Sequence, residues 1–469
     1  MSTHEAGPHA LPQPSPLPSP TKPRLPMWRI LEMNLGFLGL QFSFGLQQAN
    51  MGPIYSYLGA SEGELPVLTL AGPITGLLVQ PLVGALSDRT AGRFGRRTPY
   101  FVLGAVICAV CLFFMPLSAS LLMAVSLLWI LDAGNNITME PYRAYVADRL
   151  SPSQRQVGYL SQSAFTGLAQ MLAFLAPSML VVWGVNQNAV DAHGIPLTAR
   201  LAFWTGAVLS LVTIGWSILR VPELPLTPAQ RSEIAARRRG FLAVLREIGH
   251  AIATMPRAMR QLGLMALFQW SAMWGYWTYS AYVLAHNIYG TGDPASAGFR
   301  SAVLLNGEMM AFGNAVAVLA AFAMVPLSRK LGPGTLHAAC LAAGGAGMLS
   351  LPLAGEPGMA FLPAIGVGLA WGSIMGNPHT ILAGVVPPQH VGVYMGIFNM
   401  MIVIPMMLFA MAVGQLDLGF VRIGLGLFEK ALGSDPSRMV SVCGLGMMVA
   451  AAAVLAIREG RAPRRASGA

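Results

Sequence analysis

LLWILDAGNNITMEPYR, residues 127–143, is the stretch that decides how the chain must fold. It lies within an apolar run, residues 121–143, that is long enough to cross a bilayer, and Asp132 falls at the midpoint of that run. A bare carboxylate at that depth costs at least roughly 2.5–3.5 kcal/mol, so an acid there is expected to be functional. The polar residues that follow on the same helical face are Asn135, Asn136 and Glu140. We therefore expect this face to line a pathway for a solute.

The composition places the whole chain in a membrane. The 469 residues are 54% hydrophobic and only 10% charged, and their mean hydropathy is +0.58. Soluble domains carry about 25% charged residues, so this composition predicts a polytopic membrane protein. The 52 Gly and 34 Pro suit packed and interrupted transmembrane helices. A net charge of +10 would suggest a nucleic-acid partner in a soluble protein, but here it reflects membrane topology, and no nucleic acid is expected.

Apolar runs of about 20 residues recur along the chain and predict an all-α protein with twelve transmembrane helices. The predicted spans are residues 30–57, 66–87, 99–118, 121–143, 157–183, 200–220, 261–285, 301–325, 335–354, 358–385, 391–415 and 439–457. All but five of the 29 Lys and Arg residues lie in the tails and in alternate connections. The positive-inside rule therefore predicts that both termini are cytoplasmic.

The connections divide the chain into five parts. We predict a disordered Pro-rich cytoplasmic tail (1–28), an N-terminal six-helix bundle (29–220), a cytoplasmic central loop (221–260), a C-terminal six-helix bundle (261–457) and a basic cytoplasmic tail (458–469). The halves echo each other weakly, as residues 154–158 (QRQVG) and 388–392 (PQHVG) show. Two duplicated six-helix halves resemble the major facilitator architecture, in which the substrate site lies near the midplane between them.

A charged loop follows the second predicted span. It carries Asp88, Arg89, Arg96 and Arg97 at the expected cytoplasmic face, and it resembles the loop signature of the major facilitators with a longer insert. Such a cluster can pair across the ends of neighbouring helices and so act as a gate. The alternative is simple topology-setting charge, although Asp88 adds nothing to a positive-inside orientation.

Several motifs resemble the sucrose–proton symporter family, within the glycoside–pentoside–hexuronide group of the major facilitators. They are residues 70–84 (LAGPITGLLVQPLVG) with 87–89 (SDR), 131–136 (LDAGNN) with 141–144 (PYRA), 39–42 (GLQF) with 46–47 (LQ), and 396–399 (GIFN) with 402–405 (IVIP). The matches cover both halves. The plant members' charged residues in the fifth span and at the outer end of the seventh are absent here, so the resemblance does not specify the sugar.

The resemblance implies that Asp132 is the proton-coupling carboxylate. Burial in an apolar span independently favours a neutral carboxyl group that can bind and release a proton during a transport cycle. The alternative is a structural Asp that is hydrogen-bonded inside the bundle. Asn135 and Asn136 offer donors and acceptors for sugar hydroxyl groups, although either could instead stabilise the bundle. Glu140 and Arg143 lie further toward the cytoplasm, where we expect a local ion pair near the inner gate.

Other candidate substrate-binding residues are distributed over several spans. They are Gln47 in the first span, Trp274 and Trp277 in the seventh, Glu308 in the eighth, Asn377 in the tenth and Asn399 in the eleventh. Tryptophan faces can stack on sugar rings while amides bind hydroxyl groups, but each ring could instead pack between helices or lie at the interface. Glu308 could bind substrate, titrate, or pair with Arg300, and His379 could titrate or simply be packed.

Together these features predict a transporter rather than an enzyme: symport of a glycoside, such as sucrose or maltose, with a proton. Sodium coupling is the rival, but residues 66–86 lack the paired acids that sodium-coupled members of the group carry. A facilitator or proton-driven exporter of another solute stays open, as does a non-transport assembly or sensor protein on the same fold. We expect a monomer in a bacterial-type inner cell membrane, with no metal and no cofactor other than the proton.

Overall fold

The computed structural model describes residues 22–90, 92, 94–228, 232, 249, 252–255, 257–385, 391–419 and 421–456. The N-terminal tail up to residue 21, most of the predicted central loop and the C-terminal tail from residue 457 lie outside the described residues. The described part is almost entirely helical. Its strands β1 (Leu416–Asp417) and β2 (Arg422–Ile423) form one short antiparallel hairpin.

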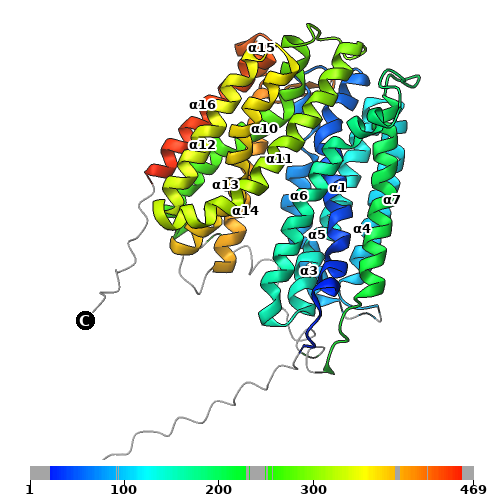
Figure 1. Cartoon of the computed structure of the whole chain (residues 1–469), viewed down its shortest axis with the longest axis vertical. Helices are drawn as coiled ribbons and strands as arrows, with labels where there is room; N and C mark the ends of the chain where they lie inside the picture. The colour runs from blue at the N-terminus through cyan, green and yellow to red at the C-terminus, as the bar shows by residue number, and fades with distance from the viewer. Residues whose placement is uncertain are drawn as a thin grey trace, which may run out of the picture.

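The helices form two bundles that stand side by side (Figure 1). The first bundle contains α1 (Met27–Tyr57), α2 (Leu65–Leu68), α3 (Ala71–Arg89), α4 (Thr98–Phe114), α5 (Leu121–Arg149), α6 (Pro152–Val182) and α7 (Leu197–Arg220). The second contains α10 (Arg257–Asn287), α11 (Ala297–Leu331), α12 (Pro333–Ser350), α13 (Phe361–Val385), α14 (Val391–Val413), α15 (Leu427–Leu432) and α16 (Pro436–Leu455). Short 3-10 turns are η1 (Met115–Leu117), η2 (Leu351–Leu353) and η3 (Pro357–Ala360).

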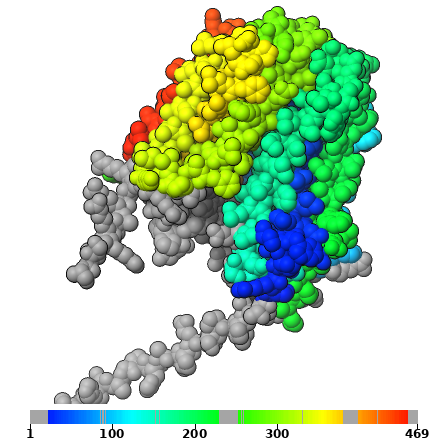
Figure 2. All heavy atoms as spheres, in the orientation of Figure 1, coloured from blue at the N-terminus to red at the C-terminus, as the bar shows by residue number. Residues whose placement is uncertain are grey.

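The same packing pattern occurs in both bundles. In the first bundle, α1 packs against α6 and α7, and in the second α10 packs in the same way against α14 and α16. Likewise, α4 packs against α5 and α7, and α12 packs against α13 and α16. The bundles also meet through equivalent pairs, because α6 packs against α11 and α3 packs against α14. Figure 2 shows the first of these contacts, where yellow-green α11 borders teal α6. The internal repeat that the sequence only suggests is therefore visible in the packing.

The two ends of the molecule differ in charge and in how the bundles meet. The basic end is the one at which α1 begins and near which Arg97 and Arg143 lie. The closed end is the opposite one, which carries Glu62, Tyr282 and His286. The bundles diverge toward the basic end in Figure 1.

Nine stretches of the described chain are long and apolar enough to cross a membrane, including the whole of α5. Helices α1 and α10 lie at two further predicted spans, and α14 overlaps a third, of which residues 397–413 form a shorter apolar helix. α1 is less apolar because it carries several polar residues between positions 41 and 50, namely Gln41, Gln47, Gln48 and Asn50. A multi-pass membrane protein is thus confirmed.

Small residues allow the helices to approach closely. A Cβ atom at Gly39 of α1 would lie 2.9 Å from the Cα atom of Ser210 in α7, and the Ser210 hydroxyl donates a hydrogen bond to the Gly39 carbonyl at 3.1 Å. Between α4 and α5, a Cβ atom at Gly104 would lie 2.6 Å from the Gly134 carbonyl oxygen. Such close backbone contact provides van der Waals packing where lipid removes the hydrophobic drive for association.

Candidate substrate cavity between the two bundles

A cavity of about 800 Å3 lies between the two bundles and is lined by both of them. Its lining extends from Tyr282 near the closed end to Arg143 and Tyr159 near the basic end. The polar residues contributed by the first bundle include Gln41, Gln47, Gln48, Gln80, Asp132 and Asn136. Those contributed by the second include Trp274, Trp277, Asn306, Asn314, Trp371 and Asn399.

Asp132 lies on the cavity wall and is 1% exposed. Its Oδ1 atom accepts a hydrogen bond of 2.6 Å from Nε2 of Gln47 in α1. Helix α3 approaches from another side at Gly72, where a methyl group would lie 3.6 Å from Oδ2. Among the described residues, no Lys, Arg or His forms an ion pair with Asp132. The carboxylate therefore has a single amide donor and no compensating positive charge beside it.

Asn136, one turn after Asp132, connects α5 to α3. Its Nδ2 atom donates to the Asp132 carbonyl at 2.8 Å and to the Thr75 hydroxyl at 3.1 Å. Its Oδ1 atom accepts from Nε2 of Gln80 at 2.5 Å. These hydrogen bonds fix the orientation of the Asn136 amide, and the Asn136 side chain is part of the cavity lining.

Asn135 faces the other way. It is fully buried, is not part of the cavity lining, and its Oδ1 atom accepts a hydrogen bond of 3.1 Å from the Cys108 thiol of α4. Successive helical residues point about 100° apart, so two adjacent asparagines need not contact the same surroundings. The structure places Asn135 in the packing between α4 and α5, outside the cavity lining, and its role in substrate binding or in stabilising the bundle stays a prediction.

Aromatic rings form the wall contributed by the second bundle. Trp277 of α10 and Trp371 of α13 contact each other edge to face, with ring centroids 5.3 Å apart and planes at 83°. Trp274 also lines the cavity, and its indole Nε1 is buried with no hydrogen-bond partner in the described part of the chain. A buried donor without a partner is costly, so this N–H is suited to a polar group of a ligand.

Three other predicted residues of the second bundle have different positions. Asn399 of α14 lines the cavity. Glu308 of α11 does not, and within the described chain no ion pair joins it to Arg300, which instead donates to the Asn188 side chain. Asn377 is buried outside the lining and donates to the Ser373 hydroxyl at 2.7 Å. The side chain of His379 lies outside the described residues.

At the closed end, hydrogen bonds join the two bundles. The hydroxyl groups of Ser56 and Tyr282 are 2.7 Å apart, and the Tyr279 hydroxyl donates to the Glu62 carbonyl at 3.3 Å. The backbone N–H of Gln415 donates to the Gly63 carbonyl at 2.9 Å. In addition, Nε2 of His286 lies 3.2 Å from a Glu62 carboxylate oxygen.

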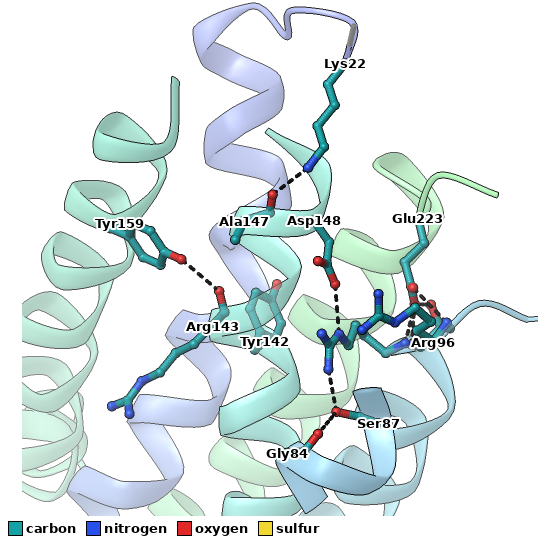
Figure 3. A network of polar contacts seen from close by, with 12 residues as sticks. Lys22, Gly84, Ser87, Arg96, Tyr142, Arg143, Ala147, Asp148, Tyr159 and Glu223 are labelled. Atoms are coloured by element: carbon teal, nitrogen blue, oxygen red, sulfur yellow. Dashed lines mark hydrogen bonds and ion pairs between the residues drawn. The ribbon is translucent and has the colours of Figure 1, made fainter. Parts of the chain in front are cut away.

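At the basic end, a polar cluster ties together the elements of the first bundle (Figure 3). Arg97 is only 3% exposed, its Nε lies 2.9 Å from Asp148, and its Nη1 donates to the Ser87 hydroxyl at 2.5 Å. The Glu223 carboxylate accepts from the backbone N–H groups of Arg96 and Arg97, both at 2.8 Å. Arg96 and Arg97 are thus held by contacts with α3, α5 and the segment after α7.

The predicted pair of Glu140 and Arg143 is present, with Oε1 and Nη1 2.9 Å apart. Arg143 also lines the cavity, and its carbonyl accepts from the Tyr159 hydroxyl at 3.4 Å. The side chains of Asp88 and Arg89, the other predicted gate residues, lie outside the described residues.

The sequence did not single out two residues that matter here. Trp371 stands alone in an apolar span, where nothing distinguishes a cavity-lining ring from a packed one. Glu223 follows α7 and gave no signal, because its hydrogen-bond partners lie more than 120 residues away. Across the described residues, no cluster of His, Cys, Asp and Glu could hold a metal ion.

Comparisons with known proteins agree with this geometry. A family model described as Major Facilitator Superfamily matches residues 33–410. Sucrose transport protein SUC4 of Arabidopsis thaliana is 27% identical over 343 residues, which are 68% of this chain and 66% of that protein. Sucrose transport protein SUT5 of Oryza sativa subsp. indica is 24% identical over 327 residues, which are 62% and 60%. The chain thus spans slightly less than two thirds of the length of these relatives.

Solved structures show the same fold. A mutant of the nucleoside transporter NupG superposes with a TM-score of 0.68 at 13% identity, covering 91% of this chain and 100% of that one. A bacterial homologue of the human lysosomal transporter Spinster, in an inward-facing and occupied conformation, gives 0.61 at 17%, covering 92% and 96%.

The family and all of these relatives are transporters, not enzymes, and the predicted resemblance to the sucrose transport proteins is confirmed. The chain belongs to the Major Facilitator Superfamily.

Proposed function

We propose that the chain is a secondary active transporter that carries a glycoside together with a proton by alternating access. The observation that carries the proposal is Asp132: a carboxylate with one amide donor and no basic partner among the described residues, on the wall of a cavity between two duplicated bundles. Such a group can exchange a proton with either side only when the cavity opens to that side. Binding and release can thereby be tied to the rocking of the bundles.

The lining favours a sugar. Gln47, Asn136 and Asn399 present amides, which suit hydroxyl groups because they donate and accept. Trp274 and Trp277 present apolar ring faces on the opposite wall, which suit the C–H faces of a pyranose or furanose. The sucrose transport proteins among the relatives support a disaccharide such as sucrose or maltose.

We assign twelve spans with both termini in the cytoplasm, as the distribution of basic residues predicts. The basic end then faces the cytoplasm, where the cluster around Arg97 forms one part of the inner gate, together with the Glu140–Arg143 pair. With this orientation, the hydrogen bonds between the bundles close the outer end, which supports an inward-facing arrangement. The cavity is complete within one chain, which supports a monomeric transporter in the cell membrane.

Substitution of Asp132 by Asn tests proton coupling. Purified protein is reconstituted in liposomes, and counterflow of labelled sucrose, maltose and other sugars identifies the substrate. A pH gradient of one unit supplies about 1.4 kcal/mol per proton, or about tenfold sugar accumulation for one proton per sugar. Asp132→Asn is expected to lose accumulation entirely but to keep counterflow, because exchange needs no net proton movement.

Asp417→Asn is the matched control, because Asp417 is an exposed acid in the β1–β2 hairpin that pairs with Arg422. This variant should accumulate sugar like the wild type. Uphill uptake by Asp132→Asn would contradict the proposed coupling. Sugar efflux driven by the gradient would indicate an exporter, and absence of transport with every sugar would indicate another solute or a non-transport role.

A further inference from the structure

Gln47 has a hydrogen-bonding position that substrate binding alone does not explain. Its Nε2 atom donates to Asp132 at 2.6 Å, while its Oε1 atom is buried and has no hydrogen-bond partner among the described residues. The same side chain lines the cavity. One amide of a cavity-lining side chain therefore contacts the carboxylate with its donor, while its acceptor is enclosed and unpaired among the described residues.

The two protonation states of Asp132 make opposite demands on that amide. An ionised carboxylate only accepts hydrogen bonds, so it binds the amide NH2 group, as the structure shows. A protonated carboxyl group has an O–H that needs an acceptor, and the amide that already contacts Asp132 carries one, Oε1 of Gln47, that has no partner among the described residues. Rotation of a terminal amide about its last torsion meets only a broad, low barrier.

We propose that Gln47 is the positioning residue that converts protonation of Asp132 into a change of sugar affinity. When Asp132 is ionised, its charge holds the NH2 group and leaves Oε1 of Gln47 without a partner. When Asp132 binds a proton, the amide turns, Oε1 accepts the carboxyl O–H, and the NH2 group faces the cavity as a donor. A sugar then gains a donor for a hydroxyl, ring or glycosidic oxygen. The inference rests on the proposed function and deepens it.

The other groups around Asp132 do not offer this route. Among the described residues, the charge of Asp132 acts on two other titratable side chains, Tyr55 of α1 and Cys108 of α4. Both side chains are ordinarily neutral below about pH 8. The Cys108 thiol already donates its hydrogen bond to the side-chain oxygen of Asn135. Arg143, the charged group of the lining near the basic end, is paired with Glu140.

The test measures sugar affinity against pH for two variants. Gln47→Met keeps the length of the side chain without its amide, and Gln47→Asn keeps the amide but shortens its reach. Sucrose and maltose are titrated from pH 5 to pH 8 in detergent, with the fluorescence of the cavity tryptophans as the signal. In the wild type we expect affinity to tighten at least about tenfold as the pH falls, within the range of couplings between linked sites.

In both Gln47 variants the affinity is expected to change less than about twofold over the same pH range, close to the weak wild-type value at pH 8. A pH indicator in weakly buffered solution gives a second readout: sugar binding should draw a proton into the wild type but not into the variants, because linkage is reciprocal. Gln48→Met is the control, since Gln48 also lines the cavity but has no contact with Asp132 among the described contacts. It should keep the pH dependence whatever its absolute affinity.

The possible outcomes separate the two proposals. If the wild type binds neither these sugars nor any other sugar of the counterflow panel, or binds equally well at every pH, the proposed function fails and the role of Gln47 fails with it. If the wild type depends on pH and either Gln47 variant retains that dependence, the role of Gln47 is overturned while proton coupling stands. Loss of the dependence in Gln48→Met as well would also overturn a specific role for Gln47.

Discussion

Two carboxylates of the first bundle have opposite surroundings. Glu223 accepts hydrogen bonds from the backbone N–H groups of Arg96, Arg97 and Thr98 and from the Thr98 hydroxyl, at the N-terminus of α4. Its negative charge is therefore met by four donors and by the positive end of the helix dipole. Asp132 has one amide donor. The first carboxylate is surrounded by donors that also cap a helix, while the second has little support for its charge.

Replacing Glu223 by Ala should destabilise the protein by about 0.5–2 kcal/mol, because the first N–H groups of α4 lose their capping acceptor. The loss of stability is measured as a lower melting temperature of the detergent-solubilised Glu223→Ala variant. The control is Glu356→Ala, because Glu356 precedes η3 and makes no capping hydrogen bond with its side chain. Equal melting temperatures for the two variants would show that the Glu223 cap contributes nothing.

The buried acid Asp132 could be predicted from the sequence, but the capping of α4 by Glu223 could not. Asp132 was predictable because an acid in an apolar run is conspicuous whatever surrounds it. The cap by Glu223 depends on the segment after α7 returning to the start of α4, which no local pattern encodes.

Among the elements, α1 must be polar on one side and closely packed on another. Its glutamines face the cavity, while Gly39 lies against α7. A Cβ atom at Gly39 would meet the Ser210 Cα atom at 2.9 Å and the Leu209 carbonyl oxygen at 3.0 Å. Backbone atoms cannot rotate away as a side chain can, so the helices themselves would have to separate.

Gly39→Ala should therefore destabilise the first bundle by about 1–3 kcal/mol, the usual cost of overpacking. Gly215→Ala in α7 is the control, because a Cβ atom there meets nothing within 4 Å. Thermal unfolding of both variants in the same detergent measures the difference. A melting temperature of Gly39→Ala at or above that of Gly215→Ala would contradict the assigned packing.

Helix boundaries followed hydropathy only in part. The span predicted at 121–143 belongs to a helix, α5, that continues to Arg149, because backbone hydrogen bonds extend beyond the apolar run. The span predicted at 66–87 is divided into α2 and α3, with the Thr69 hydroxyl bonded back to the Leu65 carbonyl at 2.8 Å. Apolarity marks the membrane-crossing part of a helix, not its ends.

In the whole molecule, the closed end contains a titratable contact between the bundles. His286 follows the predicted span 261–285, and the Glu62 carboxylate at 3.2 Å raises the pKa of its imidazole above the ordinary value. The ion pair is fully formed below the ordinary pKa of about 6.5 and is lost as the pH rises through the raised pKa. Low pH should therefore favour the shut closed end.

Spin labels at Ala192→Cys and Ala295→Cys, one on each bundle at the closed end, can report this opening as a distance distribution. We expect the population with the longer distance to grow between pH 5.5 and pH 8 in the otherwise unchanged protein. Glu62→Gln should open the closed end at pH 5.5 and remove this dependence on pH.

Glu64→Gln is the matched control, because Glu64 bonds to Ser61 within the same bundle. It should behave as the unchanged protein does. A response of Glu62→Gln to pH as large as that of Glu64→Gln would contradict the assigned contact.

The sequence by itself determined the membrane class, the positions of the apolar helices and the presence of a buried acid, because these depend on composition and on the order of residues along the chain. It also revealed the family through local motifs, since the residues of each motif are contiguous. Only the tertiary structure decided that Asn136 rather than Asn135 faces the cavity, that Gln47 reaches Asp132, and that Trp371 completes the aromatic wall. The reason is physical: these contacts join helices far apart in sequence, and the rotation of each helix about its axis is set by the packing of the whole bundle.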